Sequence, residues 1–324
     1  MALRWGLLST ARINTAILAA ARTADDVDVA AVGSRDLARA EAYAREHGIQ
    51  AAHGSYEALL EDPDVDAIYI SLPNGPHVEW SIRALEAGKH VLCEKPLTRR
   101  VADAERAFDA AEAAGLVLME AFMWRHNPQT QALARLVRDG AIGELRLVRT
   151  AFSFTLDDPG DVRLNAGLDG GALMDLGCYC ISAIRLFGGE PLRVSGQAVT
   201  TADGVDRRFA ATLRHDGDVL TTLDCAFDLP PRRELQAVGT SGVLSTEDPW
   251  HCSASRIDIR RPDGTAETVT VTPQDSYRLE LENFGAAVQG TAEPLLGRAD
   301  ALGQARTIEA LYASAAADGG AMTI

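Results

Sequence analysis

Short apolar runs alternate with amphipathic stretches over the first 121 residues. The apolar runs predict strands at Trp5–Leu8, Val27–Val32, Ala67–Leu72, His90–Cys93 and Val117–Ala121. The stretches between them predict helices at Asn14–Arg22, Leu37–His47, Tyr56–Leu60, His77–Ala87 and Val101–Ala114. This alternation is typical of βαβ units, so we expect an α/β Rossmann domain built on a doubly wound parallel sheet.

From about residue 122 the pattern changes to alternating strands with few helices. Helices are expected at Gln129–Arg138, Ala172–Phe187, Ser276–Gly290 and Asp300–Ala316. Strands are expected at Gly143–Phe154, Leu192–Thr201, Arg207–Arg214, Val219–Phe227, Glu234–Val238, Val243–Thr246, Arg256–Arg261 and Glu267–Val271. The turn signals at 215–218 and 261–264 indicate hairpins. We therefore predict a Rossmann domain over 1–122 and an α+β domain with a large, mostly antiparallel open sheet over 123–324. The last helix is a candidate for packing back on the first domain.

The composition of the chain excludes several classes of binding partner. A formal charge of −15 argues against binding to nucleic acid or an anionic membrane, since both need clustered cations. No apolar run approaches the ~20 residues of a membrane helix. The apolar stretch 3–21 is interrupted by Arg12 and Asn14, which argues against a signal peptide. With five cysteines, an odd number, we expect reduced thiols and a cytoplasmic protein. The seven histidines lack ligand spacing, so no metal site is predicted.

The segment Ala87–Leu97 is the first candidate for chemistry. A short apolar run there ends in Glu94, Lys95 and Pro96, at the edge where open α/β sheets bind ligands. Lys89 and Lys95 are the only two lysines, whereas arginine is frequent. A lysine ammonium can be tuned toward neutrality and arginine cannot, so Lys95 is a candidate catalytic residue; the alternative is a surface lysine in a turn.

The turn after the first predicted strand stands where a dinucleotide fingerprint would begin. A G-x-G-x-x-G pattern would place glycines at positions 9, 11 and 14, and none is present. Each substitute is small or tolerated in turns, so the backbone can still approach a pyrophosphate at a helix N-terminus. We expect this turn to bind the cofactor through Ser9, Thr10, Ala11, Arg12 and Ile13.

Two further loops follow strand ends at the same edge. The second strand ends in Ser34 and Arg35, which favours NADP over NAD because arginine suits a 2′-phosphate; the alternative is a solvated Arg35, with Asp36 capping the next helix. The rigid loop after the strand at 67–72 supplies further cofactor candidates, although His77 could simply begin the helix. These candidates are Ser71, Leu72, Pro73, Asn74 and His77.

The predicted helix Ala172–Phe187 carries Asp175 and Tyr179, which are four residues apart and therefore share a face. Placing a carboxylate in apolar surroundings costs free energy unless the group is paired or hydrogen-bonded. It either orients a proton-transfer group, or it caps the helix or pairs with an arginine while Tyr179 is a core aromatic residue. The polar loop before the helix carries Asp161, Arg163 and Asn165, which could bind a hydroxyl-rich ligand.

The motifs Glu94-Lys95-Pro96 and Gly170-Gly171-Ala172-Leu173-Met174-Asp175-Leu176-Gly177-Cys178-Tyr179, with the order of the domains, resemble the glucose–fructose oxidoreductase / inositol dehydrogenase / MocA family. Tyr179 and the segment 120–125 resemble the subgroup of glucose–fructose oxidoreductase, dimeric dihydrodiol dehydrogenase and NADP-dependent D-xylose 1-dehydrogenase. The resemblance implies an NADP-dependent enzyme acting on a small carbohydrate, with Glu94, Lys95 and Arg125 near the cofactor and Asn127 near the substrate. Arg125 could serve either ligand. The second-domain sheet suggests a homodimer or homotetramer.

The chemistry that this implies is hydride transfer between nicotinamide and a sugar carbon. We expect Tyr179 to exchange the proton with the substrate hydroxyl, Lys95 to lower the phenol pKa from about 10, and Asp175 to steer the substrate or Lys95. Lys95 as the base is the rival assignment. Substrate contacts are expected from Lys95, Asn127, Arg163, Asn165, Asp175 and Tyr179. The reaction is either oxidation of an aldose at C1 or reduction of a keto-sugar, an anhydro-sugar or a nucleotide-linked sugar. A sensor that binds NADP without turnover is the alternative from another class.

Overall fold

The computed structural model describes residues 2–324. These divide into two compact units. Unit 1 contains the chain up to Met123 and the segment Asp275–Leu302; unit 2 contains Trp124–Gln274 and Gly303–Ile324. The structure differs from the expected division in one respect. The segment that returns to the first unit contains the penultimate helix, whereas most of the last helix belongs to the second.

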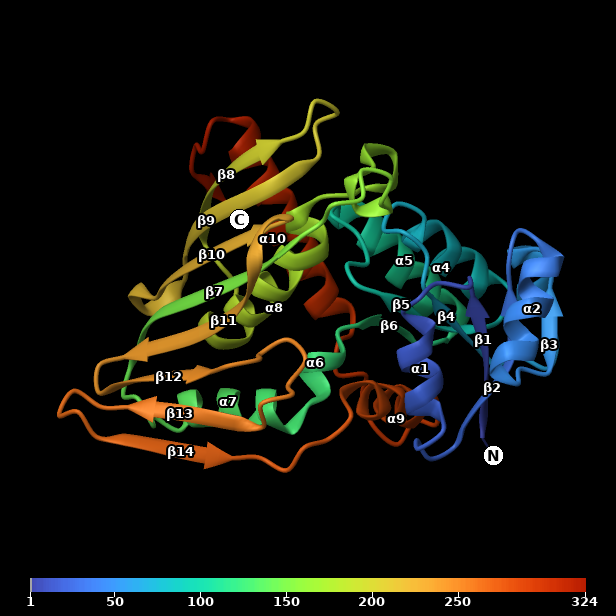
Figure 1. Ribbon diagram of the computed structural model, residues 1–324, viewed down its shortest axis with the longest axis horizontal. Coiled ribbons are helices and arrows are strands. Elements are labelled where there is room, and N and C mark those ends of the chain that lie inside the picture. The colour runs from blue at the N-terminus through green and yellow to red at the C-terminus, as the bar shows by residue number, and fades with distance from the viewer. Residues whose placement is uncertain (1) are drawn as a thin grey trace. The chain divides into compact units, whose positions relative to one another are not determined.

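Unit 1 is built on a six-stranded parallel sheet (Figure 1) in the order β3-β2-β1-β4-β5-β6. The strands are β1 (Leu3–Leu8), β2 (Val27–Gly33), β3 (Ala51–His53), β4 (Ala67–Ile70), β5 (His90–Glu94) and β6 (Leu118–Ala121). The helices are α1 (Asn14–Ala21), α2 (Leu37–His47), α3 (Tyr56–Leu60), α4 (His77–Glu86), α5 (Val101–Ala114) and α9 (Ser276–Val288). The sequence missed β3, which has only three residues and pairs only with β2. The sheet confirms the predicted Rossmann domain.

The strand order of unit 1 sets the position of a ligand site. Chain connections run from β1 outward to β2 on one side and from β4 outward to β5 on the other. Because such crossovers are right-handed, their helices cover opposite faces and leave a crevice where the order reverses. That reversal lies between β1 and β4, at the ends of which stand Ser9 and Ser71.

Unit 2 is built on a nine-stranded sheet in the order β14-β13-β12-β11-β7-β10-β9-β8-β15. Only the β7–β10 pair is parallel, so the predicted mostly antiparallel sheet is confirmed. The strands are β7 (Leu145–Thr155), β8 (Arg193–Thr200), β9 (Asp206–Arg214), β10 (Leu220–Ala226), β11 (Asp228–Gly239), β12 (Gly242–Thr246), β13 (Arg256–Arg260), β14 (Ala266–Thr270) and β15 (Met322–Thr323). The helices of this part of the chain are α6 (Met123–His126), α7 (Pro128–Arg138), α8 (Cys178–Gly188) and α10 (Arg298–Ala316).

A π-helical turn, Leu173–Gly177, precedes α8 directly. The helical region 166–188 is long and apolar enough to satisfy a length-and-composition test for a membrane span, which corrects the expectation that no stretch would. However, 78% of its most apolar window is buried inside the protein. It packs on β7 and β10, so it is a core helix of unit 2 (Figure 1).

Candidate functional site

The turn after β1 begins at Ser9, which is buried and has a φ of 139°. L side chains rarely adopt this backbone region, and a fingerprint glycine would enter it freely. The Ser9 hydroxyl compensates with two contacts. Its Oγ accepts a hydrogen bond from the Ala11 amide at 3.1 Å and lies 2.8 Å from the Ser71 hydroxyl oxygen. Two of the predicted cofactor residues are therefore joined across the point where the strand order reverses.

The N-terminus of α1 follows this turn without a side-chain cap. The Asn14 amide donates to the Ser9 carbonyl at 2.8 Å, and its Oδ1 is buried without a hydrogen-bond partner among residues 2–324. The first amides of α1 donate to the carbonyls of the preceding turn, so the helix start attracts an anion through its positive dipole end. The turn therefore fits a pyrophosphate. The individual contacts of Thr10, Arg12 and Ile13 with a cofactor stay a prediction.

At the end of β2, Ser34 is buried and Arg35 is exposed. The Asp36 carboxylate accepts a hydrogen bond from the Arg39 amide at 3.2 Å and caps α2, so it is a capping residue as the alternative interpretation had it. Within residues 2–324 no ion pair is found for Arg35. The strand end thus fits the 2′-phosphate of NADP, since an unpaired guanidinium stands where NAD-binding sheets place a carboxylate.

His77 is completely buried and joins two loops at the carboxyl edge of the sheet. Its Nδ1 lies 2.9 Å from the Pro96 carbonyl oxygen and its Nε2 lies 2.8 Å from that of Leu72. Burial lowers the pKa of His77, the two carbonyl contacts oppose this, and the charge of Lys95 lowers it further. A neutral ring can donate to only one of the two carbonyl oxygens at a time, and both contacts are with the protein itself. A contact between His77 and the cofactor stays a prediction.

Lys95 follows β5 directly and is partly accessible. Its amide donates to the Glu94 carboxylate at 3.2 Å. Beyond it, the Leu97 amide donates at 2.7 Å to Glu120, a buried carboxylate of β6, while His77 holds the Pro96 carbonyl. The backbone that follows Lys95 is therefore held by side chains of α4 and β6.

In unit 2, the segment from Gly171 to Arg185 is buried except for two residues, Asp175 and Tyr179. These are the two residues that the sequence predicts on one helix face, and both are partly exposed. Asp175 lies within the π-helical turn and Tyr179 in the first turn of α8. Wider turns of this kind occur often at functional sites.

Arg163 brings the polar loop to this face. Its Nε lies 2.9 Å from the Asp175 carboxylate, and its guanidinium also pairs with Asp161 at 3.1 Å. The two glycines after the loop are required. A Cβ at Gly170 would lie 2.4 Å from the Arg163 carbonyl oxygen, and Gly171 has a φ of +139° with a Cβ position 2.2 Å from Asp206. Asp175 thus pairs with an arginine, as one interpretation of the sequence had it, but on the accessible face.

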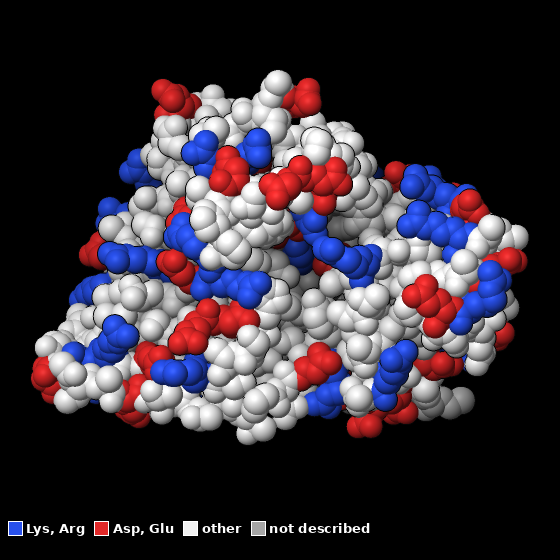
Figure 2. Space-filling model, viewed as in Figure 1, with Lys and Arg blue, Asp and Glu red and all other residues white. Residues whose placement is uncertain are grey.

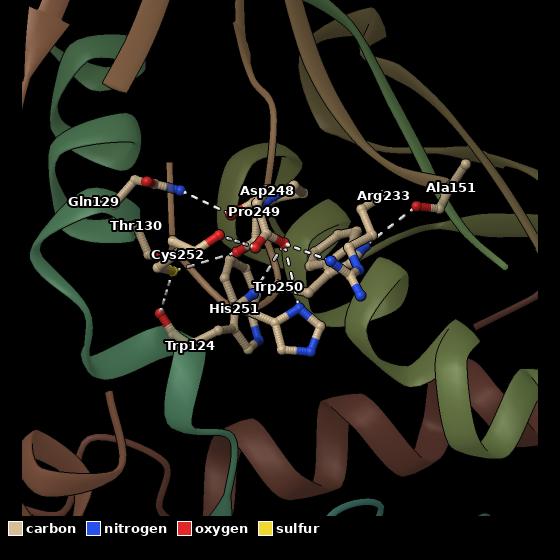
Figure 3. A network of polar contacts seen from close by, with 11 residues as sticks. Trp124, Gln129, Thr130, Ala151, Arg233, Asp248, Pro249, Trp250, His251 and Cys252 are labelled. Atoms are coloured by element: carbon tan, nitrogen blue, oxygen red, sulfur yellow. Dashed lines mark hydrogen bonds and ion pairs between the residues drawn. The ribbon is translucent and has the colours of Figure 1, made fainter. Parts of the chain in front are cut away.

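No pattern in the sequence pointed to the aromatic residues around Tyr179. Phe152 of β7 meets its ring edge-on, with centroids 5.6 Å apart, and the Trp250 ring lies 5.9 Å away. Trp250 is fully buried and donates to the Ala151 carbonyl (Figure 3). Phe152 and Trp250 are about a hundred positions apart in the chain, so only the folded structure could reveal the cluster.

Three other predicted residues have roles within the fold. Asn127 is buried, caps α7 by accepting from the Gln129 amide, and donates to the Gln274 carbonyl at 3.1 Å. Asn165 is exposed and accepts from the Gly167 amide. Arg125 donates to the Ser182 hydroxyl at 3.1 Å. Their contacts with substrate or cofactor stay predictions, as does the convergence of Lys95 of unit 1 with Tyr179 of unit 2.

Two expectations concern metals and thiols. Residues 2–324 contain no group of three or more His, Cys, Asp or Glu side chains arranged to hold a metal ion. All five cysteines are free and buried.

Comparison with known proteins covers both units. The model of an oxidoreductase family with an NAD-binding Rossmann fold, GFO_IDH_MocA, matches residues 3–122. The model of the GFO/IDH/MocA C-terminal domain matches residues 130–245.

Individual relatives carry several names. A D-xylose 1-dehydrogenase (NADP(+)) of Haloferax volcanii is 42% identical over 96% of this chain and 97% of its own. A dTDP-3,4-didehydro-2,6-dideoxy-alpha-D-glucose 3-reductase of Streptomyces violaceoruber is 38% identical over 80% of this chain and 77% of its own.

Among solved structures, a 3-ketoreductase from Actinomadura kijaniata in complex with NADP and TDP-benzene superposes with a TM-score of 0.91. It is 33% identical and covers 97% of this chain and 98% of its own. Two family models match in the expected order, and the likeness spans nearly the whole length. This chain therefore belongs to the GFO/IDH/MocA oxidoreductase family and is an NAD(P)-dependent oxidoreductase.

Proposed function

We propose that this protein is an NADP-dependent sugar oxidoreductase that oxidises C1 of an aldose of the xylose or glucose type to a lactone. The observation that carries the proposal is the accessible pair Asp175 and Tyr179 on an otherwise buried helix. Such a carboxylate–phenol pair suits proton exchange with a hydroxyl group. The choice of an aldose rests on the 42% identity to a D-xylose 1-dehydrogenase (NADP(+)).

The cofactor is NADP. Solved relatives are described with NADP bound, and Arg35 at the end of β2 suits its 2′-phosphate. When bound, NADP supplies the hydride acceptor or donor. The uncapped N-terminus of α1 and the Ser9 turn would hold the pyrophosphate.

Residues of this chain would transfer the proton to and from the substrate. Tyr179 exchanges it with the reacting hydroxyl, and Lys95 donates a hydrogen bond to the same oxygen. Arg163 fixes the Asp175 carboxylate at 2.9 Å, so Asp175 can accept a hydrogen bond from a second hydroxyl of the sugar. General acid–base assistance of this kind contributes about 10²- to 10⁴-fold to rate. Lys95 as the proton carrier is the rival assignment.

The test measures NADP⁺ reduction with a panel of aldoses and NADPH oxidation with keto-sugars. For the best substrate, Tyr179→Phe is expected to lower kcat by about 10²- to 10⁴-fold, because phenylalanine cannot carry the proton. The pH–rate profile is compared with that of Lys95→Met. Substantial turnover by Tyr179→Phe would exclude the tyrosine as sole proton carrier and favour Lys95.

Reduction of a nucleotide-linked keto-sugar is the second candidate function. It is favoured by the relatives named as 3-reductases of a dTDP-linked sugar and by the 3-ketoreductase fold. NADPH oxidation with a keto-sugar nucleotide, in the absence of activity on free aldoses, would select it.

A further inference from the structure

The segment 247–255, which joins β12 to β13, carries a carboxylate–imidazole pair that the reaction described above does not use (Figure 3). The Asp248 Oδ1 lies 3.2 Å from His251 Nδ1 and also accepts from the His251 amide at 3.4 Å. Asp248 is buried, whereas the His251 side chain is 47% exposed. The pair therefore has one fixed end and one end that faces outward.

Several neighbours fix Asp248. The Ser253 hydroxyl donates to its Oδ2, and the Gln129 amide donates to its backbone carbonyl at 3.1 Å. Burial alone would raise the pKa of Asp248, but the hydrogen bond from Ser253 and the contacts of His251 outweigh it, and the pKa is lowered. An ionised carboxylate can only accept, so His251 Nδ1 carries the hydrogen in this contact. The Nε2 atom is left to bind something else.

The imidazole lies beside the aromatic cluster that contains Tyr179. Phe152 meets the His251 ring edge-on at 6.3 Å and the Tyr179 ring edge-on at 5.6 Å. Trp250, the residue before His251, is turned inward and stacks on the same Phe152 at 5.9 Å. The tryptophan thus anchors the segment in the core, and the next side chain is presented to solvent one aromatic ring away from the proposed proton carrier.

We propose that His251 is a specificity-determining residue whose Nε2 hydrogen-bonds a second hydroxyl group of the sugar that reacts at Tyr179. Asp248 acts as its positioning residue. The inference rests on the proposed sugar oxidoreductase function. A hydroxyl can donate to the lone pair of a neutral imidazole or accept from an imidazolium, so sugar hydroxyls match this group in either state. An oriented, half-exposed imidazole loses little freedom on binding, which favours its use in recognition.

Two substitutions distinguish the role of His251 Nδ1 from that of His251 Nε2. In His251→Asn the amide can replace Nδ1 and keep the Asp248 contact, but nothing replaces Nε2. In His251→Gln the longer side chain places its amide near the position of Nε2. If Nε2 binds substrate, His251→Asn is expected to lose about 10- to 100-fold in kcat/KM, and His251→Gln to retain most of it. If the ring serves only to hold Asp248, the order is reversed, and that result would overturn the inference.

The substrate is varied in the same experiment. D-Glucose and its monodeoxy derivatives are compared with NADP⁺ for the wild type, both His251 variants and Arg260→Gln, an exposed control on β13. The wild type is expected to have a kcat/KM about 10-fold or more lower for one deoxy sugar than for D-glucose. His251→Asn is expected to abolish that difference and to leave the differences for the other deoxy sugars unchanged. Arg260→Gln is expected to match the wild type. Equal discrimination in both His251 variants and the wild type would refute the role of His251. Lack of turnover by the wild type with every free and nucleotide-linked sugar would instead refute the proposed function itself.

Discussion

Glu280, on α9, is a carboxyl group without a visible partner. Its side chain is fully buried, and neither oxygen has a hydrogen-bond partner among residues 2–324. Burial raises its pKa well above the ordinary value of 4.5, and the charge of Glu94 raises it further. Glu94 itself accepts a hydrogen bond from the Tyr69 hydroxyl at 2.5 Å. Burial and the charge of Glu94 therefore both favour the protonated form of Glu280.

This environment predicts a pH-dependent stability. Below about pH 4.5 the carboxyl is protonated in both folded and unfolded chains. As pH rises further, the unfolded chain releases the proton while the folded chain keeps it, so this group lowers stability by up to about 1.4 kcal/mol per pH unit until its folded pKa is reached. Glu280→Gln removes the effect. The variant is expected to have a higher melting temperature than the wild type at pH 7.

The control is Glu293→Gln, an exposed carboxylate of the same unit. It is expected to leave the melting temperature within the error of the wild type across the same pH range. A Glu280→Gln advantage that stays constant from pH 4 to pH 8 would show that Glu280 is not protonated in the folded chain.

The position of several candidate residues at strand ends could be predicted from the sequence, while their roles stay predictions. Ser9, Ser34, Ser71 and Lys95 all lie at the carboxyl edge of the parallel sheet, because a Rossmann sheet aligns its strand ends. Glu280 could not be identified in this way. Its position at 0% exposure depends on the return of α9 to unit 1, which no local pattern encodes.

At the scale of elements, the helix with Asp175 and Tyr179 is held at its first turn by another strand and helix. The Asp206 Oδ2, on β9, accepts from the Leu173 amide at 2.7 Å, and its Oδ1 accepts from the Tyr312 hydroxyl of α10 at 2.8 Å. Asp206 is buried and acts as a cap for the π-helical turn. Its carboxylate therefore fixes the orientation of the turn that contains Asp175.

We expect Asp206→Asn to lower kcat/KM for the sugar by about tenfold, because the amide can accept only through one of its two atoms. The KM for NADP is expected to stay unchanged, since all of the predicted cofactor residues except Arg125 lie in unit 1. Tyr312→Phe keeps the acceptor for the Leu173 amide and is expected to cost less. Steady-state kinetics of both variants measure this, and an equal rise in both Michaelis constants would indicate general loss of structure instead.

Most helices and strands could be predicted, since the apolar spacing that defines them is local. The sequence placed the helix after the polar loop at 172–187, and the structure has helix over 173–188. It could not show that the first five of these residues form a π turn. The geometry of the π turn depends on the two glycines that precede the turn and on Asp206, which lies more than thirty residues away in the chain.

At the scale of the whole chain, the strong negative charge is not gathered in one region of the visible face. Acidic and basic side chains are interspersed there (Figure 2). Opposite charges on different strands of the unit 2 sheet form ion pairs: Arg232 of β11 pairs with Asp224 of β10 at 2.7 Å, and Arg208 of β9 pairs with Asp228 of β11 at 3.2 Å. The net charge of −15 thus leaves the open sheet locally balanced, which is compatible with association between copies.

The predicted homodimer or homotetramer through the unit 2 sheet leads to the last test. Alternate residues of β9 are buried, and the face that carries Ala210 and Thr212 is exposed. On the same face these short side chains stand between Arg208 and Arg214 along the strand, so an identical sheet could pack on a small flat area bordered by charges. Ala210→Glu places a negative charge at the centre of this surface. At a two-fold interface that charge would face the same charge on the other copy. By analytical ultracentrifugation the wild type is expected to sediment as an oligomer and Ala210→Glu as a smaller species, whereas the exposed control Ala38→Glu of α2 is expected to match the wild type. A wild-type monomer at micromolar concentration, or an oligomer insensitive to Ala210→Glu, would rule out this interface.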